Sequence, residues 1–144
     1  MIRAILVGAA LAAGATVAMA QSDPIAERRS IMKSVGAATR TGNQMAKGDI
    51  PFDAAKAKEV LAVYARAADK THTYFPETSK TGGETTASPK IWENQAEFRA
   101  KFDEWGRNIQ KAAASTDDLA SFKTAFGELS QACNSCHQSF RISR

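Results

Sequence analysis

Apolar residues recur every three or four positions in four stretches of the chain, which is the spacing of amphipathic α-helices. The first stretch follows Asp23, a capping residue, and Pro24, which suits the first helical position. It should end at Lys47 and Gly48, because glycine accepts the left-handed conformation that ends many helices. Its inward row includes Arg28, a cation that needs a partner in such a place. The other members of this row are Ile25, Met32, Val35, Thr39, Gly42 and Ala46.

The second stretch should begin after Asp53 and end near Lys70. Residues 71–88 contain Phe75-Pro76, Gly82-Gly83 and several serines and threonines, so they predict a loop, and a loop of this length often covers something. A lone histidine such as His72, at the loop entrance, is usually a surface or capping residue. The inward row of the second stretch is rich in alanine and consists of Ala57, Val60, Leu61, Tyr64, Ala67 and Ala68.

The third stretch starts with Ser88 as cap and Pro89 at its first position, and the fourth starts near residues 116–118, which include two aspartates. In the third and fourth stretches the apolar residues alternate between steps of three and four. Two rows with this spacing predict helices packed about 20° from antiparallel. The fold class is therefore all-α, an antiparallel up-down-up-down four-helix bundle. The third row is Ile91, Gln95, Phe98, Phe102, Trp105, Ile109 and Ala112, and the fourth is Leu119, Phe122, Phe126, Leu129, Cys133, Cys136 and Phe140.

The first twenty residues predict a cleaved signal peptide rather than part of the fold. Arg3 supplies the positive charge, residues 5–17 form an alanine-rich apolar run, and Ala18-Met19-Ala20 is an A-x-A cleavage site. A membrane anchor is the alternative, but the run is short and no basic stop-transfer cluster follows it. We therefore expect residues 21–144 to form one exported domain with no membrane span.

Charge adds little to this picture. The chain has 19 Lys and Arg against 15 Asp and Glu, and the basic residues are scattered. Without a basic run, nucleic-acid binding has no support. There is also no phosphate-binding loop and no arrangement of nucleophile, base and orienting group, so we expect the protein not to be an enzyme.

The fourth stretch carries the chemistry, in the segment Cys133-Asn134-Ser135-Cys136-His137. Two cysteines separated by two residues, with histidine directly after the second, form the attachment site of a c-type haem. Each thiol can add to one vinyl group of the porphyrin, and the adjacent imidazole then reaches the iron. The chain has only these two cysteines. Both fall on the inward row, so both sulfurs should point into the bundle.

Three other uses of this segment fit the sequence less well. A thioredoxin-like Cys-x-x-Cys sits at a helix start after a strand, and neither feature is expected here. A zinc site needs four ligands, whereas only three candidates lie nearby. A disulfide across one helical turn would be strained, because its geometry fits a regular helix poorly.

These features together resemble the class II cytochromes c, the cytochrome c′ family. The resemblance covers essentially all of the chain after the signal peptide. Besides residues 133–137 it includes Lys47-Gly48-Asp49-Ile50-Pro51-Phe52-Asp53, Gly82-Gly83, Pro89-Lys90-Ile91-Trp92 and Phe140-Arg141.

The resemblance implies one covalent haem c, bonded to Cys133 and Cys136, with His137 as the proximal axial ligand of the iron. It also implies that Arg28 contacts a haem propionate, which would explain a cation in the inward row. Arg141 lies one turn past His137, where the family typically has an arginine beside the proximal face. The alternative for each arginine is a surface cation whose stem covers apolar groups.

Met32 occupies the position that, in the family, faces the distal side of the iron. Where that residue is bulky and non-coordinating, the iron is five-coordinate and its open side can take NO or CO. Some low-spin relatives have a methionine there as the sixth ligand, and a soft sulfur favours ferrous iron. Met32 could instead only fill space in the core, which is the usual role of methionine.

The resulting hypothesis is a periplasmic monohaem electron carrier, with iron held by His137 and Met32 and with other redox proteins as transient partners. The alternative is a five-coordinate cytochrome c′ that binds NO or CO at an open distal site. The family often forms antiparallel dimers through its first two helices. The alanine-rich second helix permits such a homodimer here without requiring it.

Overall fold

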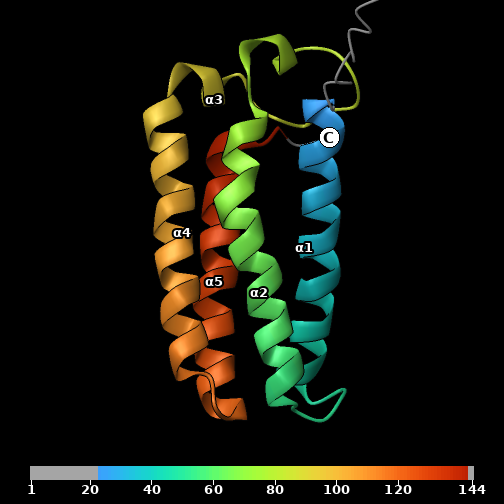
Figure 1. Cartoon of the computed structure of the whole chain (residues 1–144), viewed down its shortest axis with the longest axis vertical. Helices are drawn as coiled ribbons and strands as arrows, with labels where there is room; N and C mark the ends of the chain where they lie inside the picture. The colour runs from blue at the N-terminus through green and yellow to red at the C-terminus, as the bar shows by residue number, and fades with distance from the viewer. Residues whose placement is uncertain (1–22, 143–144) are drawn as a thin grey trace, which may run out of the picture.

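The structure, a computed structural model, describes residues 23–142. The signal peptide expected at residues 1–20 lies outside this range. Within it, four long helices run alternately up and down, with a short fifth helix near the loop end, and no β-strand is formed. Figure 1 shows α1, α2, α4 and α5 running along the long axis of the bundle, with α2 in front of α5 in this view. The predicted all-α antiparallel up-down-up-down four-helix bundle is confirmed.

Helix α1 (Pro24–Lys47) begins and ends where the sequence predicts. The Asp23 side chain accepts a hydrogen bond from the backbone N–H of Ile25 at 2.9 Å. Gly48 ends the helix with φ 84°, which is the left-handed conformation expected of it. The last turn differs from the prediction, because Met45 is fully buried and Ala46 is only half-buried. A helix of 3.6 residues per turn drifts away from a strict seven-residue repeat, so the row shifts by one position.

Helix α2 (Ala54–Lys70) also matches its prediction. Asp53 accepts hydrogen bonds from the backbone N–H groups of Ala55 and Lys56, at 2.8 and 3.0 Å. The loop that follows contains two short 3₁₀ turns, η1 (Thr71–Tyr74) and η2 (Glu77–Ser79). The predicted inward row is buried at every position: Ala57, Val60, Leu61, Tyr64, Ala67 and Ala68.

The third predicted helix is divided in two, and here the prediction of one continuous helix is wrong. Helix α3 (Lys90–Glu93) stops at Asn94, whose φ of −131° and ψ of 50° are not helical, and α4 (Gln95–Ser115) starts directly after it. The break lets the Trp92 indole N–H donate to the carbonyl oxygens of Phe75 and Pro76, at 3.1 and 3.2 Å. Gln95, which was expected to face inward, is exposed as a result.

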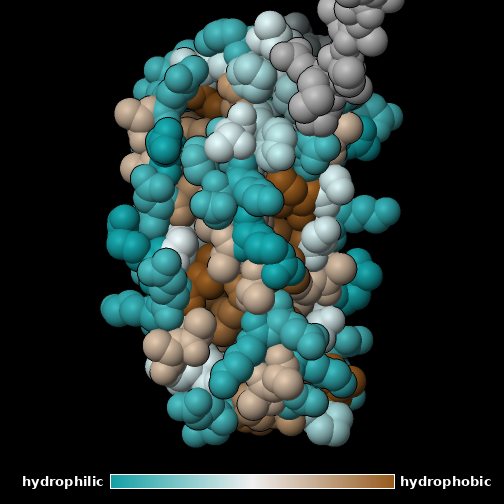
Figure 2. Space-filling model, in the orientation of Figure 1, coloured by the Kyte–Doolittle hydropathy of each residue, from teal (hydrophilic) through white to brown (hydrophobic). Residues whose placement is uncertain are grey.

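Helix α5 (Leu119–Phe140) carries the cysteine motif without interruption. Asp118 and Ser121 form a reciprocal capping box at its start, with the Ser121 N–H donating to Asp118 at 2.8 Å. Rings and aliphatic side chains from all four long helices fill the bundle, and Figure 2 shows apolar surface mainly in the seams between helices. A smaller apolar cluster at the loop end consists of Ile91, Trp92, Phe98 and Phe140.

Candidate functional site

A cavity of about 960 Å³ lies between the helices, lined by residues of all five helices and of the loop after α2. This volume is at the upper end of the range of small-molecule and cofactor sites. Every residue that the sequence singled out for chemistry lines this one cavity. They are Arg28 and Met32 on α1, Cys133, Cys136 and His137 on α5, and Arg141 directly after it.

The two thiols are free and half-buried on the wall of the cavity. Burial raises the pKa of Cys133 to about 11, and the nearby Cys136 adds to this shift. Burial also raises the pKa of Cys136, against the opposing positive charge of Lys101. As long as neither sulfur is covalently bonded, both are therefore neutral thiols at pH 7.

His137 projects from α5 next to Cys136, and its side chain is accessible from the cavity. Burial lowers the pKa of this imidazole, and the positive charge of Arg141 lowers it further. A neutral imidazole keeps a ring nitrogen with a free lone pair, which is the form that binds metals. The histidine is thus suited to be an iron ligand.

Met32 lines the same cavity from α1, and its half-buried side chain packs against the main apolar cluster. Met45 is 0% exposed and lies deeper in that cluster, away from the cavity lining. The cavity therefore brings one thioether, that of Met32, together with the imidazole of His137, from different helices.

Arg28 is only 5% exposed, and its guanidinium is held by the loop after α2. It donates to the backbone oxygens of Tyr74 and Ser79 at 3.0 and 3.1 Å. It also donates to the side-chain oxygens of Ser79 and Thr85, at 2.9 and 2.8 Å. The Phe75 ring lies beneath it, with 4.6 Å from guanidinium carbon to ring centroid. Burial lowers the pKa of Arg28 and the charge of Asp23 raises it.

The expectation of a partner for Arg28 is thus met by this loop, whose oxygens accept four hydrogen bonds from the guanidinium. These acceptors are mainly backbone and hydroxyl oxygens, and no sequence pattern could have identified them. The length of the loop was the only available signal. A contact between Arg28 and a haem propionate stays a prediction.

Arg141 lies at the cavity edge, and its side chain is exposed. Its Nε–H donates to the Thr86 hydroxyl at 3.3 Å, and its backbone forms an isolated antiparallel bridge with Ala87. The chain after α5 is thereby joined to the loop that holds Arg28. The expected place of Arg141 beside the proximal face stays a prediction.

Aromatic rings line the loop end of the cavity. The helical spacing of Phe98 and Phe102 predicts a place in the bundle core and haem wall, whereas Phe75 was not assigned to the site. Phe98 packs edge-on against Phe75, Phe102 and Phe140, with ring centroids 4.7, 5.2 and 5.3 Å away. His72 stands beside Phe102 at 6.0 Å and outside the cavity lining, which fits its expected role as an ordinary helix-end residue. The loop thus contributes Phe75 as part of the cavity roof.

Tyr64 is a second residue that sequence reasoning left out of the site. It lines the cavity from α2, and its hydroxyl lies 2.7 Å from that of Thr39. Thr39 donates its single hydroxyl proton to the Val35 carbonyl at 2.8 Å, so Tyr64 must donate to Thr39. Burial raises the pKa of Tyr64 to about 12.

This shift predicts a loss of stability in alkali. An unfolded tyrosine has a pKa of about 10, so the buried neutral phenol stabilises the fold fully below pH 10. That contribution is lost as the pH rises through about 12, where Tyr64 ionises in the folded protein. The free energy of unfolding of the wild type should fall above pH 10, and that of Tyr64→Phe should fall less. Tyr74→Phe, which changes the other tyrosine, should keep the decline. If the free energy of unfolding of Tyr64→Phe fell above pH 10 as much as that of the wild type, the decline would be caused by other titratable groups.

The cavity fits a bound prosthetic group on three observations. Its volume suits a cofactor, and two thiols, an imidazole and a thioether face it together. Among the described residues, one buried side-chain nitrogen or oxygen lacks a hydrogen-bond partner, and it is Nε1 of Trp105 on the cavity wall. A buried donor without a partner is expected where the cavity wall adjoins a group that is not part of the polypeptide.

The structure bears on two of the alternatives for the motif, a disulfide and a metal site. Cys133 and Cys136 form no disulfide with each other, since both thiols are free. Over residues 23–142, no three side chains of His, Cys, Asp or Glu gather closely enough to hold a metal ion.

Over the same residues, no helix is both long and apolar enough to cross a membrane.

Comparison with known proteins gives consistent matches over nearly the whole described range. The family model described as Cytochrome C' matches residues 23–141. A cytochrome c' of Rhodopseudomonas palustris is 40% identical over 131 residues, which is 91% of this chain and 90% of that one. A cytochrome c-556 of Agrobacterium fabrum is 33% identical over 135 residues, 93% of this chain and 89% of that one.

A solved structure of cytochrome c' from Rhodopseudomonas palustris has the same fold. It superposes with a TM-score of 0.83 at 40% identity and covers 86% of this chain and 99% of that one. A four-helix bundle with a Cys-x-x-Cys-His motif in its last helix defines the class II c-type cytochromes. The chain belongs to the cytochrome c′ family. The cofactor of this family is one covalently bound haem c.

Proposed function

We propose that this monohaem cytochrome is a periplasmic electron carrier and not an enzyme, with Cys133 and Cys136 bonded to the haem and His137 and Met32 as axial ligands. The observation that carries the proposal is that the Met32 thioether and the His137 imidazole line the same cavity from different helices. Bound haem supplies one-electron chemistry at its iron. The signal peptide predicted at residues 1–20 and relatives named cytochrome c-556 support this reading.

In this reading the polypeptide supplies attachment, axial ligands and protection from water. The thiols of Cys133 and Cys136 lie one helical turn apart on one face of α5, so both can reach the same edge of a flat group. Phe75, Phe98 and the other roof residues limit the entry of water and lower the local dielectric constant. Because thioether sulfur is soft, Met32 would stabilise the ferrous state and raise the reduction potential.

A second candidate function is the binding of NO or CO at an open distal site. It is favoured by the identity of 40% to a protein named cytochrome c', against 33% to one named cytochrome c-556. In that case Met32 would only pack against the apolar cluster beside the cavity.

Optical spectroscopy of the purified haem protein separates the two functions. We expect a low-spin ferric spectrum with a methionine–iron charge-transfer band in the wild type. Met32→Ala should lose that band, become high-spin and take up CO readily when reduced. Met45→Leu changes the other methionine of α1, which is buried away from the cavity, and should keep the wild-type spectrum. A high-spin wild type that binds CO readily would refute methionine ligation and leave the gas-binding function.

A further inference from the structure

Positive charge is concentrated around the cavity. Five cationic and two anionic side chains line it, whereas the whole chain has 19 Lys and Arg against 15 Asp and Glu. The imbalance at the cavity is therefore larger than composition alone would give. The cationic residues are Arg28, Arg29, Lys33, Lys101 and Arg141, and the anionic residues are Glu84 and Glu104.

The two carboxylates are already engaged. Glu84 pairs with Arg29 at 2.8 Å, and Glu104 lies 4.0 Å from the Lys101 ammonium. These are the only ion pairs among residues 23–142, so the other three cations at the cavity have no carboxylate partner. The pair of Lys101 and Glu104 is weak, because it is long and half exposed to solvent. It therefore cancels little of the positive field that an approaching molecule meets.

Four of these five cations can be reached from outside the molecule, but one of them, Arg29, is held by Glu84 at 2.8 Å. Lys33 and Arg141 are exposed, and the Lys101 side chain is 37% exposed, whereas Arg28 is buried under the loop. Lys33 comes from α1, Lys101 from α4 and Arg141 from the end of α5, so the fold alone brings them to one cavity. We call these three residues the cationic rim.

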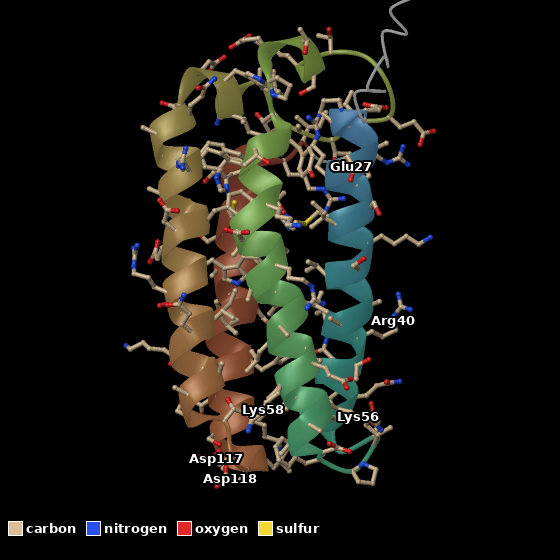
Figure 3. All side chains as sticks on the ribbon, viewed as in Figure 1. Glu27, Arg40, Lys56, Lys58, Asp117 and Asp118 are labelled. Atoms are coloured by element: carbon tan, nitrogen blue, oxygen red, sulfur yellow. The ribbon has the colours of Figure 1, made fainter. Side chains whose placement is uncertain are left out.

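Surface cations usually face only solvent, so the opposite end of the bundle serves as a comparison. There Lys56 and Lys58 of α2 gather with Asp117 and Asp118, as the labelled side chains in Figure 3 show. That end mixes both signs of charge. The cavity lining thus has an excess of cationic over anionic side chains, which these four labelled residues do not have.

We propose that the cationic rim is the docking surface for an acidic redox partner protein, whose carboxylates face Lys33, Lys101 and Arg141. The inference rests on the proposed electron-carrier function and names the chemistry of its partner. Opposite charges around an electron-exchange site raise the rate of encounter and orient the partner, while adding little to the lifetime of the complex. The two propionates of a bound haem would offset part of this positive field. The cationic rim should therefore raise the rate of encounter with the partner only moderately.

The test measures electron transfer from the reduced haem protein to two small oxidants of opposite charge at low ionic strength. The anion hexacyanoferrate(III) should react about two- to threefold more slowly with Lys33→Gln or Arg141→Gln than with wild type. The cation tris(phenanthroline)cobalt(III) should react faster with the same variants. Both differences should disappear in about 0.5 M salt, where exposed charges are screened. Lys58→Gln, at the opposite end of the bundle, should match the wild type with either oxidant.

Poly-L-glutamate serves as the acidic polypeptide in a second measurement. It should slow the reaction of the wild type with hexacyanoferrate(III) by covering the cationic rim, and it should have no effect on the triple variant of Lys33, Lys101 and Arg141 to Gln. Equal rates for rim and control variants, or equal inhibition of the triple variant, would overturn the docking surface. Failure of the electron-carrier function is seen separately, as a high-spin spectrum with ready CO uptake in the same samples.

Discussion

Arg28→Met should lower the free energy of unfolding of the haem protein by about 3 kcal/mol, because it removes one side of a buried polar network. The guanidinium donates four hydrogen bonds to Tyr74, Ser79 and Thr85, and methionine can replace none of them. Buried acceptors would then lose their donor, and the stacking on Phe75 would be lost as well. Denaturant unfolding, followed by the haem absorbance and by circular dichroism, measures the change.

The neighbouring arginine is the matched control. Arg29 reaches the same loop through Glu84, but this pair is exposed, with side chains 55% and 72% accessible. Arg29→Gln should therefore change the free energy of unfolding by less than about 1 kcal/mol. If Arg28→Met were no worse than Arg29→Gln, the buried network would contribute nothing beyond an exposed ion pair.

Arg28→Lys separates the loop network from the charge. An ammonium keeps the positive charge that a haem propionate would attract, but it cannot reproduce the planar guanidinium that bonds several loop oxygens at once. If Arg28 acts by holding the loop, Arg28→Lys should expose the chain to cleavage after Lys80, which is exposed in that loop. If its charge toward a propionate were its whole role, Arg28→Lys would resist cleavage as well as the wild type.

The ends of the helices could be predicted because the interactions that define them are local. Asp23, Asp53 and Asp118 each cap the helix that directly follows, and Gly48 ends α1 through its own backbone conformation. The break at Asn94 could not be predicted in this way. The apolar spacing continues across it, and the cause is distant: Trp92 must reach carbonyl oxygens of residues 75 and 76.

The site could be predicted in part, for a similar reason. The spacing of Cys133, Cys136 and His137 describes one helical turn and needs nothing else. That Met32 lies on the same cavity depends on how α1 is placed against α5, and only the family resemblance suggested it. Tyr64 entered the predicted core but not the site, since its hydrogen bond to Thr39 joins two helices that sequence patterns treat separately.

The close approach of α1 and α5 predicts a large effect at Gly42. A Cβ atom there would lie 2.3 Å from Cε2 and 2.7 Å from Cζ of the Phe126 ring, far inside van der Waals contact. The ring cannot easily move away, because it stacks between Phe122 at 5.3 Å and Tyr64 at 6.5 Å. Gly42→Ala should therefore force the helices apart or displace the ring, at a cost of about 2 kcal/mol in the free energy of unfolding.

The control is Gly127→Ala on α5, where a new Cβ meets nothing within 4 Å. This variant should be more stable than the wild type by about 0.5–1 kcal/mol, because alanine favours a helix over glycine. The same gain acts at Gly42, so the clash must outweigh it before any loss is seen. The two alanine variants should thus move the unfolding midpoint of the haem protein in opposite directions. A Gly42→Ala protein as stable as Gly127→Ala would mean that α1 and α5 are free to separate at this level, and that their contact there does not define the cavity above it.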